Sequence, residues 1–169
     1  MKIIIFVFIF FNLFITNIRA EIAYIDLNYI LNTSNVGKSL NNHIKELQSK
    51  DLAKFKEIEA KLIEKEKLII AQQNILENND FKKKLSILSS EVQKYRADKK
   101  AFTEELNKIK IEKTKEILAV LNPLITNYVD SNSISIVLPK KNIIVGKKNL
   151  DITDEIIKLL NENINSLKF

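Results

Sequence analysis

The fold is decided by residues 68–88, which read LIIAQQNILENNDFKKKLSIL. The polar residues Asn78, Asn79 and Asp80 favour a turn, because asparagine tolerates left-handed backbone and both residue types cap helix starts. On both sides of them, apolar residues recur at steps of three and four, the spacing of one helix face. The stretch therefore predicts two long amphipathic helices that meet at residues 78–80 and pair as an antiparallel coiled-coil hairpin.

Each predicted helix carries its apolar seam over about forty residues, which corresponds to an arm of roughly 60 Å. The heptad phase of the first helix slips once, because Ile44 and Phe55 are eleven residues apart. Pro123 comes late in the second helix and is expected to kink or end it. The seam residues are Leu40, Ile44, Leu47, Phe55, Ile58, Leu62, Ile69 and Leu76, then Phe81, Leu85, Leu88, Val92, Tyr95, Phe102, Leu106 and Ile109.

The segments that flank the hairpin have strand character. Residues 21–27 and 133–138 are apolar and β-branched, and residues 142–145 predict a further strand that Gly146 stops. A final helix is expected from Asp151 through Ile164. The first strand must meet the later ones to be buried, so the chain is predicted to be α+β, with the arm projecting from a small β-containing body.

This organisation predicts a body made of residues 21–36 and 130–169, and an arm made of residues 37–129. So small a body has little core of its own, and oligomerisation would supply more burial. The residues expected to hold the oligomer are the apolar strand residues Ile25, Ile134, Ile136 and Ile144.

Residues 1–20 have the layout of a secretory signal peptide: Lys2, an apolar run from Ile3, and a small residue, Ala20, where a peptidase would cut. The run is shorter than the about 20 apolar residues of a membrane span, which favours cleavage over a retained anchor. Cleavage would remove Lys2 and Arg19, leaving 25 basic and 21 acidic residues. The chain has no cysteine, so an exported form has no disulfide.

Catalysis finds no support in the residue pattern. The single histidine, His43, lies in a helical repeat without a partner pattern for base catalysis. Glutamates alternate with lysines, as on solvent-exposed helices. The sequence contains no phosphate-binding glycine loop and no paired His/Cys spacing for a metal. We therefore expect neither an enzyme nor a cofactor or metal.

Positive charge is concentrated on the outer half of the returning helix. Residues 81–100 hold seven basic and two acidic residues, whereas residues 36–77 hold eight lysines and seven acids. One interpretation is a solvated face in a chain of lysine-rich composition. The other is attraction of anionic partners, either acidic unfolded chains, anionic lipid or lipopolysaccharide, with export arguing against nucleic acid. The residues concerned are Lys82, Lys83, Lys84, Arg96 and Lys99.

Apolar residues of the arm also have two interpretations. Phe81 and Leu85 have the spacing of coiled-coil core, but they could also contact an unfolded client. Outside the seam, six apolar residues would be exposed and could make weak, distributed contacts: Ile63, Leu68, Ile70, Ile75, Ile87 and Ile111.

Three segments carry a resemblance to a known family. They are Ile22-Ala23-Tyr24-Ile25-Asp26-Leu27 with the following Tyr29-Ile30-Leu31, then Val36-Gly37-Lys38-Ser39-Leu40, and finally Asp151-Ile152-Thr153-Asp154-Glu155-Ile156. With the order of elements between them, the chain resembles the Skp/OmpH-like periplasmic chaperone family from residue 21 to about 165.

The resemblance implies a homotrimer with a β body and helical arms around a cavity. It also implies a periplasmic holdase that keeps unfolded outer-membrane proteins from aggregating without ATP. The rival hypothesis is an exported or membrane-anchored coiled-coil protein that links components of the cell envelope and has no client.

Overall fold

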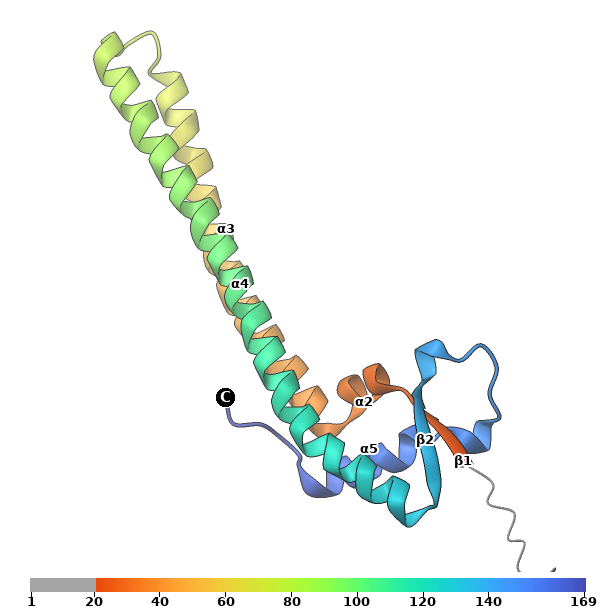
Figure 1. The fold of residues 1–169 in the computed structure, drawn as a ribbon. Helices are drawn as coiled ribbons and strands as arrows, with labels where there is room; N and C mark the ends of the chain where they lie inside the picture. The colour runs from red at the N-terminus through yellow and green to blue at the C-terminus, as the bar shows by residue number, and fades with distance from the viewer. Residues whose placement is uncertain (1–20) are drawn as a thin grey trace, which may run out of the picture.

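The computed structural model describes residues 21–169, which form a small body with a long two-helix arm projecting from it (Figure 1). The predicted α+β class is confirmed, and the predicted signal peptide lies outside the described residues. None of the helices in residues 21–169 combines the length and apolarity needed to cross a bilayer. In chain order the elements are β1 (Glu21–Ile25), α2 (Leu27–Thr33), α3 (Asn35–Ala71), α4 (Asn78–Ser131), β2 (Ile134–Pro139), the 3-10 turns η2 (Lys140–Asn142) and η3 (Lys148–Leu150), and α5 (Thr153–Asn163).

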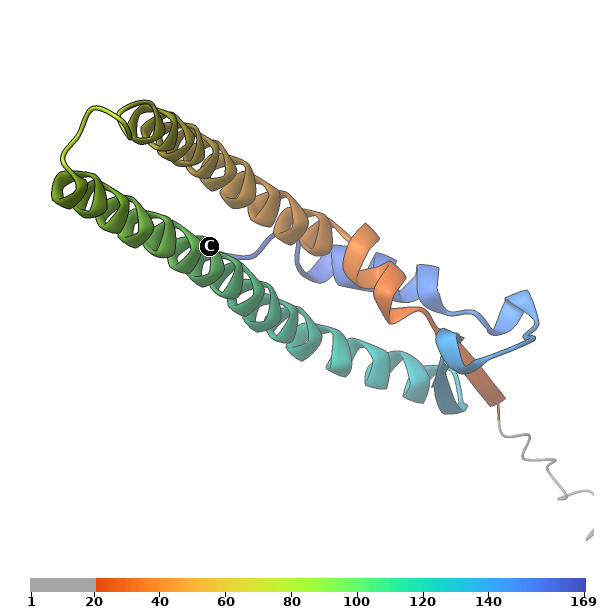
Figure 2. The same cartoon turned by 90° about the horizontal axis from the view of Figure 1, so that it is seen from above.

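The arm consists of α3 and α4, which run antiparallel and side by side (Figure 2). The predicted position of the turn is wrong: α3 ends at Ala71, residues 72–77 make the connection, and Asn78 begins α4. Asp80 lies in the first turn of α4, where a carboxylate interacts favourably with the helix dipole. The same residue types favour turns and helix starts, which explains the shift. Pro123 lies inside α4, which continues to Ser131.

Two capping side chains set the path from β1 into the arm. Asp26 accepts a hydrogen bond from the backbone N–H of Tyr29 at 2.9 Å and caps α2, and Ser34 accepts one from Gly37 at 3.2 Å and caps α3. Ser34 is fully buried between the two helices. A Cβ on Gly37 would lie 2.1 Å from the backbone oxygen of Leu31, so only glycine lets α2 and α3 approach this closely.

The sheet of the body has two parallel strands, β1 and β2, which confirms that the first strand meets a late one. Ile22 is opposite Ile136, and Tyr24 is opposite Leu138. On its other edge, Tyr24 forms a bridge with Asp151, so β1 is the inner strand. The third strand predicted at residues 142–145 does not form. Ile144 lies there in an irregular segment and is 99% exposed.

One apolar core joins the body to the base of the arm. Val36 and Leu40 of α3 and Ile117 and Leu121 of α4 are buried together with residues of β1, α2 and α5. The predicted final helix forms as α5 and buries Ile156 and Leu160 in this core. The core residues from outside the arm are Ala23, Ile25, Ile30, Ile152, Ile156 and Leu160.

A polar network at the start of α5 ties the two strands to this helix. Asp151 accepts hydrogen bonds from Lys140 at 2.7 Å, from the backbone N–H of Thr153 at 3.1 Å and from the Thr153 hydroxyl. Thr153 in turn accepts one from the backbone N–H of Asp26 at 2.9 Å. Burial alone would raise the pKa of Asp151, but these hydrogen bonds together hold that pKa below its ordinary value of 3.8.

This network predicts an acid-dependent contribution to stability. A carboxyl whose pKa is lowered by folding stabilises fully at neutral pH, and the contribution is lost as the pH falls through the folded pKa. We expect Asp151→Asn to lower the free energy of unfolding at pH 7 by about 1–2 kcal/mol, and the difference from wild type to shrink below pH 4. Urea unfolding at both pH values measures this, with Asp98→Asn on the exposed arm as the control. An equal loss at both pH values would contradict the assignment.

Candidate functional site: the helical arm

The seam of the arm contains little buried surface beyond its base. Between Leu40 and Ile117, the buried residues are Ile69 and Leu88. Phe55 packs against Tyr95 and Phe102 with ring centroids 6.0 and 5.7 Å apart, but these rings are only half-buried. A two-helix arm with this much open seam leaves apolar side chains accessible to another molecule.

Polar pairs join the two helices where apolar burial is thin. Lys65 forms an ion pair with Glu91 at 2.6 Å, and Lys84 donates a hydrogen bond to Gln72 at 2.6 Å. The Tyr95 hydroxyl donates to Glu59 at 3.1 Å. These contacts fix the register between α3 and α4. The heptad pattern marks Lys65 and Gln72 only as polar seam positions and does not identify their partners.

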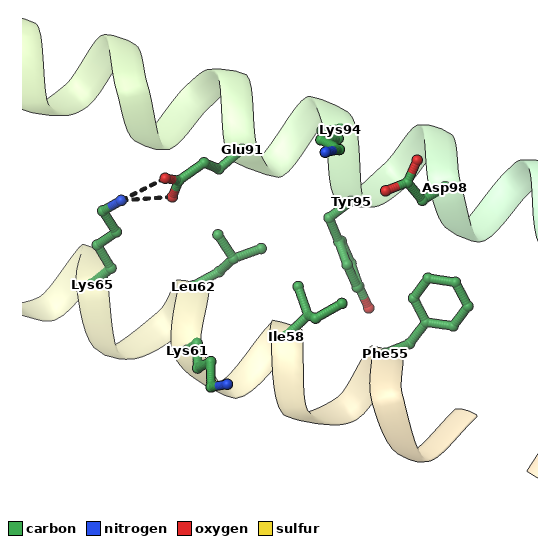
Figure 3. Close-up of a pocket in the computed structure, with 9 residues that line it drawn as sticks. All are labelled: Phe55, Ile58, Lys61, Leu62, Lys65, Glu91, Lys94, Tyr95 and Asp98. Carbon is green, nitrogen blue, oxygen red and sulfur yellow. Dashed lines mark hydrogen bonds and ion pairs between the residues drawn. The ribbon is translucent and has the colours of Figure 1, made fainter. Parts of the chain in front are cut away.

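A hollow of about 420 Å³ opens midway along the arm beside these pairs. Figure 3 shows Phe55, Ile58 and Leu62 of α3 directed toward Tyr95 of α4, with the Lys65–Glu91 pair at one end. Charged residues complete its lining: Lys61, Lys94 and Asp98. The hollow therefore offers an apolar floor with charged groups around it, a chemistry that accepts a large apolar side chain.

The six apolar residues predicted to lie outside the seam are all exposed, as expected. Ile63 and Ile70 are seven residues apart and share one stripe of α3. Ile75, in the connection at the tip, is 81% exposed. Two seam predictions need correction, because Ile58 and Leu85 are 43% and 40% exposed. The remaining exposed members of the predicted set are Ile87 and Ile111.

The predicted basic residues lie on the outer half of α4, and most of their side chains face solvent. Lys82, Lys83, Arg96 and Lys99 are exposed, whereas Lys84 is half-buried through its contact with α3. Lys99 also lies 5.6 Å from the centroid of the Tyr95 ring. Phe81 is half-buried at the start of α4. The arm thus brings Leu85 together with cationic residues on an accessible surface.

The four residues predicted to hold an oligomer are separated by the fold. Ile25 is buried in the core, and Ile134 is half-buried against it. Ile136 is 50% exposed, and Ile144 is the most exposed large apolar residue among residues 21–169. Only Ile136 and Ile144 are therefore available to another chain.

The segment after α5 returns to the base of the arm, a feature that the sequence does not signal. The ring of Phe169 stacks on His43 of α3 with centroids 4.0 Å apart. Lys113 of α4 donates a hydrogen bond to the backbone oxygen of Lys168 at 2.8 Å. His43, which has no base-catalysis pattern in the sequence, thus has a packing contact. Residues 21–169 contain no cluster of acidic or histidine side chains suited to a metal ion.

The fold defines a class of protein in which a small α+β body carries a long helical hairpin. Residues 21–160 match the family described as Outer membrane protein (OmpH-like), and the chain belongs to this family.

One solved structure shares the fold across most of its length. It is the crystal structure of an OmpH-like protein from Caulobacter crescentus CB15, provisionally described as an outer membrane chaperone. The TM-score is 0.78 at 16% sequence identity, and the alignment covers 89% of each chain. No curated protein gives a significant match.

Proposed function

We propose that this chain is an ATP-independent periplasmic holdase that binds unfolded outer-membrane proteins and prevents their aggregation. The observation that carries the proposal is the exposure of large apolar residues along both arm helices, beside basic residues that face solvent. An unfolded chain exposes scattered apolar side chains, and many weak contacts can hold it and still release it without an energy source. Membership of the OmpH-like family supports this function.

The proposal includes export through cleavage of residues 1–20 and a homotrimer held by the body, made of residues 21–36 and 130–169. Both follow from the resemblance and the sequence pattern. The alternative remains an exported or anchored coiled-coil protein that links envelope components. Such a linker needs no exposed apolar residues along its arm, and the arm of this chain has them.

An aggregation assay separates the two functions. An unfolded β-barrel membrane protein is diluted from urea with and without residues 21–169, and light scattering follows its aggregation. We expect the chain to suppress aggregation without added nucleotide when the proposed oligomer is roughly equimolar with the client. Aggregation at the same rate with and without the chain would contradict the holdase and favour the linker.

The basic residues of α4 are expected to speed client capture. Replacing Lys82, Lys83 and Arg96 by glutamine should lower the capture rate by roughly tenfold at low ionic strength, because exposed charge steers an anionic partner. The salt dependence should flatten, since the Debye length is about 8–10 Å at physiological salt. Lys84 and Lys99 are left in place because their side chains make contacts within the arm, Lys84 with Gln72 and Lys99 with the Tyr95 ring.

The matched control removes the same charge from the inner half of the arm. Lys45, Lys50 and Lys56 of α3 are exposed, and their replacement by glutamine should change the capture rate much less. Stopped-flow fluorescence of a labelled client measures both variants. Equal effects of the two triple variants would show that only net charge matters.

Anionic vesicles containing lipopolysaccharide, used in place of the client, test the proposed lipid partner in the same way.

A further inference from the structure

The hollow midway along the arm, which we call the arm hollow, has a lining that comes entirely from α3 and α4. Ile58 and Leu62 of α3 form its floor, and Phe55 and Tyr95 lie toward one end (Figure 3). Ile58 is exposed and Leu62 is only half-buried, so α4 does not cover either side chain. The arm hollow is therefore an apolar surface that the hairpin itself leaves open.

A charged pair in the seam explains why the hollow stays open. Lys65 is a seam position of α3, and Glu91 reaches it from α4 at 2.6 Å. Each of these side chains remains 42% exposed. Their charged ends must keep contact with water or with each other, because burying a charge without a partner is costly. The pair therefore cannot fill the space beside Leu62 as two apolar side chains would.

The size and the aromatic walls of the arm hollow suit one ring-bearing side chain. Its volume is about 420 Å³, whereas a cavity of about 150 Å³ is enough to hold benzene. A ring and part of the chain that carries it would therefore fit. Phe55 and Tyr95 would meet that ring at an edge or a face, which favours an aromatic over an aliphatic side chain. Lys61 and Lys94, which also line the hollow, would add cation–π contacts.

Two charged residues at the edge of the arm hollow are not used in ion pairs. Two other lysines of the lining, Lys61 and Lys65, are each paired with a glutamate. Lys94 and Asp98 form no ion pair within residues 21–169. They lie before and after Tyr95 and are four residues apart on α4, which corresponds to a rise of about 6 Å. A cation and an anion are thus available side by side at the edge of an apolar floor.

An extended peptide is complementary to Lys94 and Asp98. Backbone groups on one edge of an extended chain recur every two residues, at about 6.8 Å, close to the rise between these two positions. A backbone carbonyl can accept a hydrogen bond from Lys94 while a backbone N–H donates one to Asp98, and bonds to charged groups are stronger than neutral ones. Side chains of an extended chain stand roughly at right angles to these backbone groups, so one of them can enter the hollow.

We propose that the arm hollow binds one aromatic side chain of an extended client segment, with the adjoining backbone held by Lys94 and Asp98. The inference rests on the proposed holdase function and names what the arm recognises in a client. Strands of outer-membrane β-barrels alternate apolar and polar residues and carry aromatic residues near their ends. Such strands would therefore supply residues of the kind that the hollow accepts, in addition to the weak contacts spread along the arm.

Peptide fluorescence tests the site directly, because the chain has no tryptophan. The probe is a peptide of about ten residues, the length of a membrane strand, that alternates serine and threonine around one central tryptophan. Its emission should shift to shorter wavelength as residues 21–169 are added. A peptide with leucine at the centre should compete about fivefold more weakly, because it lacks the ring contacts. Equal competition by the leucine peptide would overturn the proposal.

A matched pair of variants locates the contact. Ile58→Ser should weaken binding of the tryptophan peptide by about fivefold or more, because the floor loses apolar contact. Ile63→Ser should leave the affinity unchanged, since Ile63 is 47% exposed on the same helix, against 43% for Ile58, but does not line the hollow. Both side chains are exposed, so the circular dichroism of both variants should match wild type. Equal weakening by the two variants would contradict binding in the arm hollow.

The double variant Lys94→Gln/Asp98→Asn tests the backbone contacts without changing the net charge. It should weaken binding of the tryptophan peptide by about threefold, because two hydrogen bonds to charged groups become neutral ones. An unchanged affinity would remove Lys94 and Asp98 from the site.

Further results separate this site from the holdase function and from a lipid site. If the wild type suppresses aggregation of the β-barrel protein but does not bind the tryptophan peptide, the site is wrong and the holdase stands. If it binds the peptide but does not suppress aggregation, the holdase is wrong and the peptide site stands. Sodium dodecanoate is the probe for an acyl chain. If wild type binds dodecanoate, Ile58→Ser removes that binding and the peptide does not bind, the arm hollow is a lipid site and the proposal is wrong.

Discussion

Gly37→Ala is expected to unfold the body, with a loss of about 3 kcal/mol or more in the free energy of unfolding. The added Cβ would lie 2.1 Å from the backbone oxygen of Leu31, and backbone cannot move aside as a flexible side chain can. In a free helix the same change would stabilise by up to about 1 kcal/mol. In this protein the clash makes the substitution destabilising, because α2 and α3 must separate to make room for the added Cβ.

Asn42→Ala provides the matched control, since Asn42 lies five residues further along α3 and is exposed. It should be neutral or slightly stabilising. Urea unfolding followed by tyrosine fluorescence suits the measurement, because the chain has no tryptophan and three of its four tyrosines, Tyr24, Tyr29 and Tyr128, belong to the body and the base of α4. A Gly37→Ala variant as stable as wild type would mean that α2 and α3 do not pack this closely.

Ile136→Asp is expected to convert the proposed homotrimer to a folded monomer. In the single chain Ile136 is half-exposed, so the aspartate remains solvated and the fold should persist. In the assembly the same carboxylate would be buried without a partner, which costs several kcal/mol for each interface. Light scattering at micromolar concentration should therefore give the mass of one chain, with the helical circular dichroism retained.

Ile111→Asp is the corresponding control. Ile111 is 56% exposed on α4, outside the body, and its replacement should leave the mass of the oligomer unchanged. Two results would contradict a role of Ile136 in holding the proposed homotrimer: an Ile136→Asp variant that stays oligomeric, or an Ile111→Asp variant that dissociates equally.

Periodicity was sufficient to predict the arm, because a seam repeated over many turns outweighs local exceptions. The exact turn was not predictable, since Asn78 and Asp80 suit a helix start as well as a loop. The strand expected at residues 142–145 shows a different limit. Ile-Ile-Val has strand propensity, but propensity needs a neighbouring strand, and the contacts of Lys140 and Tyr24 hold this segment away from β2.

The arm surface was predictable only in part. Exposure of residues such as Ile63 and Ile75 follows from their position outside the seam. The half-buried state of Lys84 could not be predicted in this way, because it depends on a contact with Gln72, twelve residues away across the hairpin. Leu85 and Ile58 have seam spacing yet remain exposed, since a pair of helices covers less of each seam than a larger bundle would.

Because the body and the base of the arm share one core, the hairpin is fixed at its base and free along the rest of its length. α3 has 37 residues, which corresponds to about 55 Å, and its only fully buried contacts with the body are near Leu40. Simple leverage then converts a tilt of about 5° at the base into a movement of about 5 Å at the tip. In the proposed homotrimer, slight repacking of Leu40 against Ile117 and Leu121 would change the distance between neighbouring arm tips. Flexibility at the base of the arm would then let the arms hold proposed clients of different size.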